Sequence, residues 1–244
     1  MEVSLGKMNQ KIKTLLTFWL GLSLVVSSIA QDRSGLNSSD VAKIVAAFKD
    51  KKLAAKDLVP AGFIKVKEAR GDLNQDGIDD VALIVQQKPG QDSDDSDLPQ
   101  IVLLFVGDKS GAFTFWKIGP HHFLDSNPNF ISEGGVGELK IQKGVLIIES
   151  QTSVSMGSWA AGGCTQKWRS EKSGFRLIGL SVVDMMRNCG CGDTIDTNYL
   201  TGDRILTSDR GPRGERTKKK ITKTNRTPAI ILWDDFDYDK FCTM

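Results

Sequence analysis

The fold of this 244-residue chain is decided at one stretch, Gly71-Asp72-Leu73-Asn74-Gln75-Asp76-Gly77-Ile78-Asp79-Asp80-Val81. Oxygen-bearing side chains recur there at alternate positions, a glycine stands where the chain must turn, and the apolar run 81–85 begins at its end. A tightly turned loop brings alternate residues towards one centre, and calcium takes about 6–8 oxygen ligands. The stretch therefore predicts a calcium-binding loop that leads into a β-strand.

The predicted ligands of the calcium ion are the side chains of Asp72, Asn74, Asp76 and Asp80 and the backbone carbonyl of Ile78. Gly77 would supply the backbone angles of the sharp turn. Three neighbouring carboxylates repel one another unless a cation offsets their charge. The alternative is a turn rich in Asp and Asn that holds no ion. Magnesium fits this pattern less well than calcium because it demands a tighter octahedral cage.

An EF-hand is excluded, because it would need a glutamate where the chain has Leu83 and a helix where apolar strand residues follow. The loop instead resembles that of the integrin-type β-propeller repeat (FG-GAP and the related VCBS repeats). The pattern of that loop is Asp-x-Asp/Asn-x-Asp-Gly-x-x-Asp before an apolar strand. Propellers repeat the motif, whereas this chain has a single copy, so a full propeller is not predicted.

Most of the chain after residue 30 also resembles a set of small exported bacterial proteins of unknown function. Beyond the loop, the segments that carry this resemblance are 157–159, 165–169, 177–179 and 197–202. These proteins have no known activity that the resemblance could carry over to this chain. The resemblance supplies no catalytic residues either.

The N-terminus has the pattern of a secretory signal peptide. Lys7, Lys11 and Lys13 precede the apolar run 15–26, and Ser28 and Ala30 are the small residues of a cleavage site. We expect residues 1–30 to be removed after Ala30, which places the protein in the periplasm or outside the cell. The alternative is an uncleaved anchor, although the apolar run is short for a span. No later run is long enough to cross a membrane, so none is expected in the mature chain.

The charge balance of the chain narrows the possible classes of partner. The chain has 32 Lys and Arg against 30 Asp and Glu, which gives no support to nucleic acid as a partner. We expect the partner to be an extracellular or envelope protein or a glycan.

The cysteines are Cys164, Cys189, Cys191 and Cys242, and an even number in an exported chain predicts disulfides, with three connectivities open. A metal site that combines Cys189 and Cys191 with His121 or His122 is the alternative.

The predicted fold class is α+β: a mostly antiparallel β-sheet built of hairpins, with an N-terminal amphipathic helix, in one β-rich domain over 31–244. The helix is indicated by the apolar stripe of Val41, Ile44, Val45 and Phe48. Turn signals at 108–111, 142–144 and 170–174 separate pairs of apolar runs. Consecutive hairpins make antiparallel pairing the expected arrangement.

These patterns predict an exported calcium-binding protein without catalysis, which would be a binding or structural module. One alternative is a hydrolase that uses carboxylates such as Asp234, Asp235 and Asp237, a type of site that is recognised only in three dimensions. Another is a module that recognises anionic surfaces through 210–226, where eight basic residues accompany a single acid. That stretch also fits a solvated hairpin or a mobile loop.

Overall fold

A computed structural model describes residues 38–88, 98, 100–119, 132–154, 159–211 and 215–242. The chain divides into two units, Met1–Asn37 and Ser38–Met244, and all of the described residues belong to the second. The predicted signal peptide, its cleavage site at Ala30 and the pair His121 and His122 lie outside the described residues.

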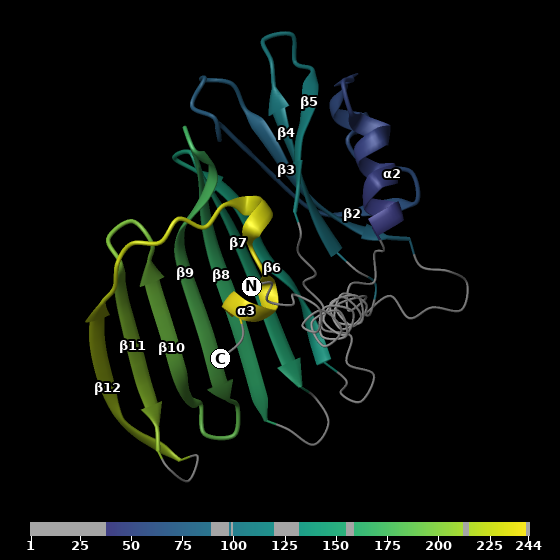
Figure 1. Ribbon diagram of the computed structural model, residues 1–244. Helices are drawn as coiled ribbons and strands as arrows, with labels where there is room; N and C mark the ends of the chain where they lie inside the picture. The colour runs from purple at the N-terminus through teal and green to yellow at the C-terminus, as the bar shows by residue number, and fades with distance from the viewer. Residues whose placement is uncertain are drawn as a thin grey trace, which may run out of the picture. The chain divides into compact units, whose positions relative to one another are not determined.

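Five antiparallel strands form the first sheet, in the order β1-β5-β4-β3-β2 (Figure 1). These strands are β1 (Lys52–Leu53), β2 (Phe63–Gly71), β3 (Asp80–Gln87), β4 (Gln100–Gly107) and β5 (Phe113–Ile118). The strand β3 is buried along nearly its whole length, as the continuous apolar run predicted. It lies between β2 and β4.

Seven antiparallel strands form the second sheet, in the order β12-β11-β10-β9-β8-β7-β6. They are β6 (Ser132–Gln142), β7 (Val145–Val154), β8 (Ala160–Glu171), β9 (Gly174–Met186), β10 (Cys191–Asn198), β11 (Asp203–Arg210) and β12 (Arg216–Asn225). Each strand is the sequence neighbour of the strand beside it, so the whole sheet is a meander.

The helices are short. The described chain has α2 (Ser38–Phe48) and α3 (Tyr238–Cys242), with single 3-10 turns η1 (Ala55–Asp57) and η3 (Trp233–Asp235). The helix α2 packs on the first sheet, because the ring of Phe48 lies 5.4 Å from that of Phe105 and 5.9 Å from that of Phe115. None of the helices in the described ranges has the length and apolarity needed to cross a membrane.

The predicted α+β class is wrong. The described chain is mostly antiparallel β-sheet, in two sheets, and α2 is a short attachment to one of them. The prediction counted one N-terminal amphipathic helix as sufficient for the α+β class, and that helix has only 11 residues. It also assigned no strand to the residues of β10 or to most of those of β11, and it offered a hairpin over 210–226, where β12 lies, only beside a mobile loop.

The core is shared between the two sheets and the end of the chain. One cluster of buried residues includes Ala82 and Ile84 of the first sheet, Ile148 and Trp168 of the second, and Trp233 near the C-terminus. The rings of Trp168 and Trp233 lie 4.8 Å apart at an interplanar angle of 75°. Burying such large aromatic rings removes much apolar surface from water, which is the main force that holds these parts together.

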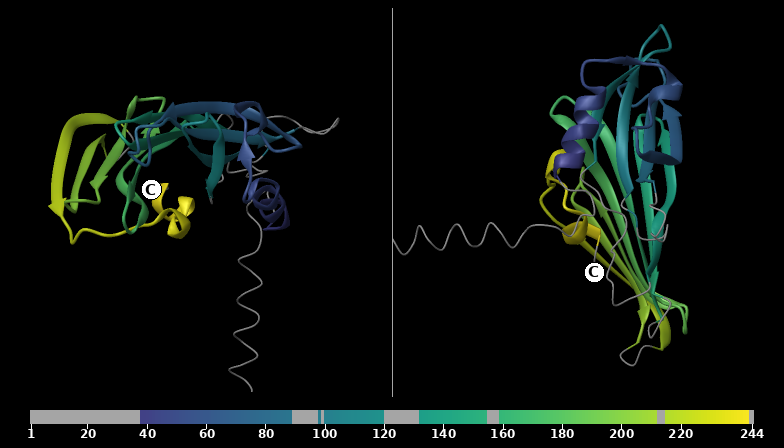
Figure 2. Two further views of the ribbon diagram at one scale, coloured as in Figure 1. Left: turned by 90° about the horizontal axis from the view of Figure 1, so that it is seen from above. Right: turned by 90° about the vertical axis from the view of Figure 1, so that its right-hand side faces the viewer.

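Residues 226–242, the C-terminal segment, cross one face of the seven-stranded sheet (Figures 1 and 2). We name this the inner face. The N–H of Leu177 on β9 donates to the carbonyl of Ile231 at 2.9 Å, and Nε1 of Trp233 donates to the carbonyl of Ile118 at 2.8 Å. A disulfide joins Cys164 on β8 to Cys242. The segment is therefore attached to both sheets.

Candidate functional site

The predicted calcium loop connects β2 to β3 and lies where the two sheets meet. Leu73 in the loop is fully buried in the cluster that both sheets share. The strand β2 contacts β6, and a Cβ on Gly71 would lie only 2.7 Å from Cγ2 of Ile141. A Cβ on Gly144, in the turn between β6 and β7, would lie 3.2 Å from Nε2 of Gln75. The loop therefore touches the second sheet while it belongs to the first.

Hydrogen bonds turn three of the predicted ligand side chains towards the backbone inside the loop. The carboxylate of Asp72 accepts from the N–H of Asp76 at 3.1 Å and from that of Gly77 at 2.8 Å. Oδ1 of Asn74 accepts from the N–H of Asp76 at 2.9 Å. Oδ1 of Asp76 accepts from the N–H of Ile78 at 2.9 Å. Gly77 has a φ of 83°, the turn geometry that the sequence predicted.

Asp80, the fourth predicted side-chain ligand, has a different environment. It is fully buried, and its Oδ2 accepts from the N–H groups of Leu73 at 2.8 Å and Asn74 at 3.2 Å. Its Oδ1 accepts from the N–H of Gly107, at the end of β4, at 3.0 Å. Burial raises the pKa of the Asp80 carboxyl, although the three hydrogen bonds act in the opposite direction. Asp80 thus anchors the loop to β4.

The donor set of the loop fits a hard cation such as calcium. Carboxylate and amide oxygens each have two lone pairs, so an oxygen that accepts one N–H still has a lone pair for an ion. In the described part of the chain, no group of three or more His, Cys, Asp or Glu side chains is arranged to hold a metal. In the loop, the carboxylate of Asp80 is directed towards buried backbone N–H groups, and two of the other predicted donors, Asn74 and the carbonyl of Ile78, are not acids.

The four cysteines form two disulfides, Cys164–Cys242 and Cys189–Cys191. This confirms that disulfides are present and fixes which of the three connectivities occurs. The alternative metal site of Cys189 and Cys191 is excluded, because a sulfur in a disulfide is not a thiolate ligand.

The acidic residues near the C-terminus have structural partners. Asp234 pairs with Lys117 at 3.2 Å, and Oδ1 of Asp237 accepts from the N–H of Lys240 at 3.2 Å in the first turn of α3. Asp235 is exposed at the end of η3. The first contact attaches η3 to β5 and the second is local to α3, and neither gives support to a hydrolytic site.

The basic stretch forms most of the hairpin of β11 and β12. Arg210 pairs with Asp184 at 2.9 Å, and Arg216 pairs with Asp209 at 3.2 Å. The strand β12 is exposed along its whole length and stands at the edge of the sheet. Lysines on an edge strand discourage pairing with another chain, which explains them without an anionic partner.

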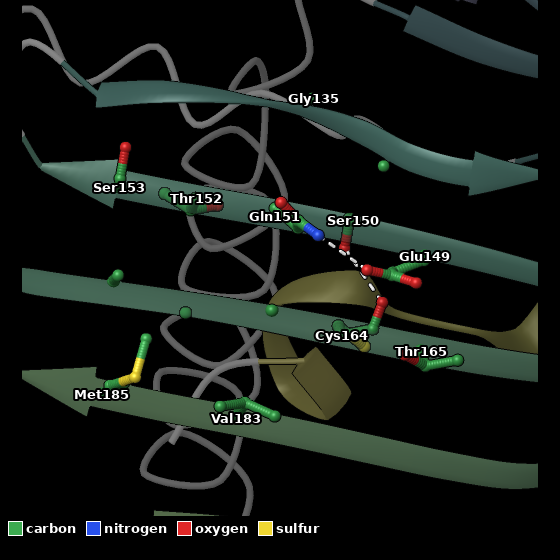
Figure 3. A pocket seen from close by; sticks show the side chains of 14 residues that line it. Gly135, Glu149, Ser150, Gln151, Thr152, Ser153, Cys164, Thr165, Val183 and Met185 are labelled. Carbon is green, nitrogen blue, oxygen red and sulfur yellow. Dashed lines mark hydrogen bonds between the residues drawn. The ribbon is translucent and has the colours of Figure 1, made fainter. Parts of the chain in front are cut away.

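The described part of the seven-stranded sheet carries a hollow on β6 to β9 and another beneath the C-terminal segment. The first, of about 640 Å³, lies over β6, β7, β8 and β9 (Figure 3). Glycines at 135, 137, 162 and 163 leave room there because they carry no side chain. Its acidic side chain, Glu149, accepts from Nε2 of Gln151 at 2.7 Å, and Val183 and Met185 are more than a third exposed beside it. No cationic side chain lines this hollow among the described residues.

The second hollow, of about 710 Å³, lies on the inner face beneath the C-terminal segment. Its lining combines aliphatic side chains of β9 and β10 with three cationic side chains, Arg204, Arg226 and Lys240. No motif in the sequence indicates this hollow. Its residues come from parts of the chain that are distant in sequence, and no spacing pattern connects them.

No protein-family model, curated protein sequence or solved structure matches this chain. The resemblance of the loop to FG-GAP and VCBS repeats therefore stays a prediction.

Proposed function

We propose that this is an exported calcium-binding protein without a catalytic role, in which the ion braces the contact between the two sheets. The observation that carries the proposal is the short loop that holds Asp72, Asn74 and Asp76, whose side-chain oxygens each accept from a backbone N–H within the loop. That loop inserts Leu73 into the shared core. An ion at the loop would thus stabilise contacts well beyond it.

The proposed roles of the residues differ. Asp72, Asn74 and Asp76 would supply side-chain oxygens, and Ile78 would supply its carbonyl. Asp80 would hold the loop in register with β4 and add negative charge close to the ion. Calcium would offset the mutual repulsion of the carboxylates.

Export is supported by two features. One is the predicted signal peptide over residues 1–30. The other is the pair of disulfides, since disulfides persist in oxidising compartments and are rare in the cytosol. Calcium is also more plentiful outside the cytosol, where modules with affinities as weak as about 10⁻⁴–10⁻³ M remain loaded. We therefore propose a binding or structural module of the cell envelope or extracellular space.

Calorimetric titration of the chain from Gln31 onward with calcium tests the proposal. We expect one saturable site in the parent protein and an affinity at least about tenfold weaker in Asp76→Ala, because a carboxylate ligand is lost. Asp79→Ala is the matched control, since it removes the same charge from the same loop outside the proposed ligand set. Equal affinities of the parent protein and Asp76→Ala, or no binding at all, would overturn the proposal.

A further inference from the structure

The floor of the inner-face hollow is apolar. Leu180 and Val182 on β9 and Ile195 on β10 line it from the sheet, and Ile231 and Phe241 line it from the C-terminal segment. Leu180, Val182 and Ile231 are buried in the shared core. A hollow of about 710 Å³ falls within the range of sites that take small organic molecules, about 300–1,000 Å³.

Three cationic side chains line the hollow, and its described lining includes no acidic side chain. Arg204 on β11, Arg226 just after β12 and Lys240 on α3 all line the hollow. No Asp or Glu is among the described lining residues, and none of the three cations forms an ion pair with an acid in the described ranges. Lys240 lies over the ring of Phe241, with Nζ 5.4 Å from its centroid.

Close backbone packing brings the two arginines together. The N–H of Arg226 donates to the carbonyl of Gly202 at 2.9 Å. A Cβ on Gly202 would lie 1.7 Å from the carbonyl oxygen of Arg226, and the φ of this glycine is 80°. Only glycine permits this approach. Arg226 therefore lies against Gly202, in the turn that leads into β11, and Gly202 is two residues before Arg204.

The pKa of the Tyr199 hydroxyl is affected by two of these cations. Tyr199 lines the same hollow and is partly buried, and burial raises the pKa of its hydroxyl. Arg204 and Arg226 both act in the opposite direction on that pKa, because each favours a negative charge on the hydroxyl oxygen. Arg204 and Arg226 therefore both lie close enough to Tyr199 to favour a negative charge on its hydroxyl.

We propose that this hollow binds a single amphiphilic anion, an alkyl chain with an oxyanion head group, with the chain on the apolar floor and the head between Arg204 and Arg226. Guanidinium groups pair well with carboxylate and phosphate oxygens, and the aliphatic side chains of the floor match an alkyl chain. Because Arg204, Arg226 and Lys240 make the lining positive, we expect it to bind an anionic amphiphile in preference to a neutral or cationic one.

The inference deepens the binding role in the proposed function, and it shares no residue with the calcium loop. The proposed function fails if calcium does not bind. The present inference fails in a separate titration, so the two failures can be told apart.

The test is calorimetric titration of the calcium-saturated chain from Gln31 onward with monomeric dodecanoate, dodecyl phosphate and dodecyltrimethylammonium. The test variant is Arg204→Gln/Arg226→Gln. The matched control is Lys219→Gln/Lys223→Gln, which removes the same charge from the same hairpin outside the hollow. Near-ultraviolet circular dichroism of each variant verifies that it folds.

We expect the two anions to bind at one site, and to bind the arginine variant about tenfold or more weakly. Binding to the lysine control should change less than threefold. A preference between the two anions identifies the head group. Equal weakening in both variants would show a general effect of charge and would overturn the inference. Equally tight binding of dodecyltrimethylammonium, or no saturable binding of either anion, would also overturn it.

Discussion

At the scale of single residues, Asp80 shows how a predicted ligand can have a second role. Its carboxylate is fully buried and accepts three backbone N–H groups, two within the loop and one from Gly107. A buried carboxylate is costly unless it is well hydrogen-bonded, and these bonds meet that need. The residue therefore holds the loop in place whether or not an ion is bound.

Replacing Asp80 by alanine should lower the free energy of unfolding by about 2–4 kcal/mol, because buried N–H groups lose their acceptor. Urea unfolding in the presence of a chelator measures this without any contribution from calcium. Asp79→Ala is the control and should cost clearly less. If both variants lose the same stability, Asp80 does not anchor the loop.

The loop could be predicted from sequence to a large extent. The bonds of Asp72, Asn74 and Asp76 run to residues no more than five positions away, so the local pattern determines them. The burial of Asp80 could not be predicted in the same way. It depends on Gly107, which lies 27 residues further along the chain.

At the scale of elements, the C-terminal segment connects parts of the molecule that are distant in sequence. The disulfide from Cys164 to Cys242 spans 78 residues and attaches α3 to β8. Beside it, the hydroxyl of Tyr238 lies 2.6 Å from Oγ of Ser150 on β7. The ring of Trp233 adds the contact with Trp168 described above.

The double variant Cys164→Ser/Cys242→Ser should lose about 2–5 kcal/mol of stability, because a disulfide that closes a long loop restricts the unfolded chain strongly. Thermal unfolding measures the loss. The variant Cys189→Ser/Cys191→Ser is the comparison and should lose much less, since its loop is very short. A larger loss in the comparison would contradict this account of the segment.

Strands that flank a tight turn between two apolar runs could be predicted from the sequence, whereas strands without an apolar pattern could not. The hairpins at 108–111, 142–144 and 170–174 are present, since tight turns between apolar runs specify them locally. The strands β10 and β11 were missed. Most of their residues are only partly buried and many are polar, so they show little alternation of apolar and polar residues.

At the scale of the whole molecule, the predicted calcium loop lies at the contact between the two sheets. The sequence indicated a loop before a buried strand, but nothing in it showed that Gly71 packs against Ile141 of the second sheet. Such contacts depend on how complete sheets meet. This is why the ion-binding pattern was recognisable and its position in the fold was not.

The most direct test of the calcium brace is urea unfolding of the parent protein and of Asp76→Ala, each in calcium and in chelator. At a calcium concentration one hundred times the dissociation constant, the parent protein should gain about 2.7 kcal/mol of stability over the chelated form. With an affinity at least about tenfold weaker, Asp76→Ala should gain no more than about 1.4 kcal/mol at the same calcium concentration. The same midpoint for the parent protein with and without calcium would contradict the brace.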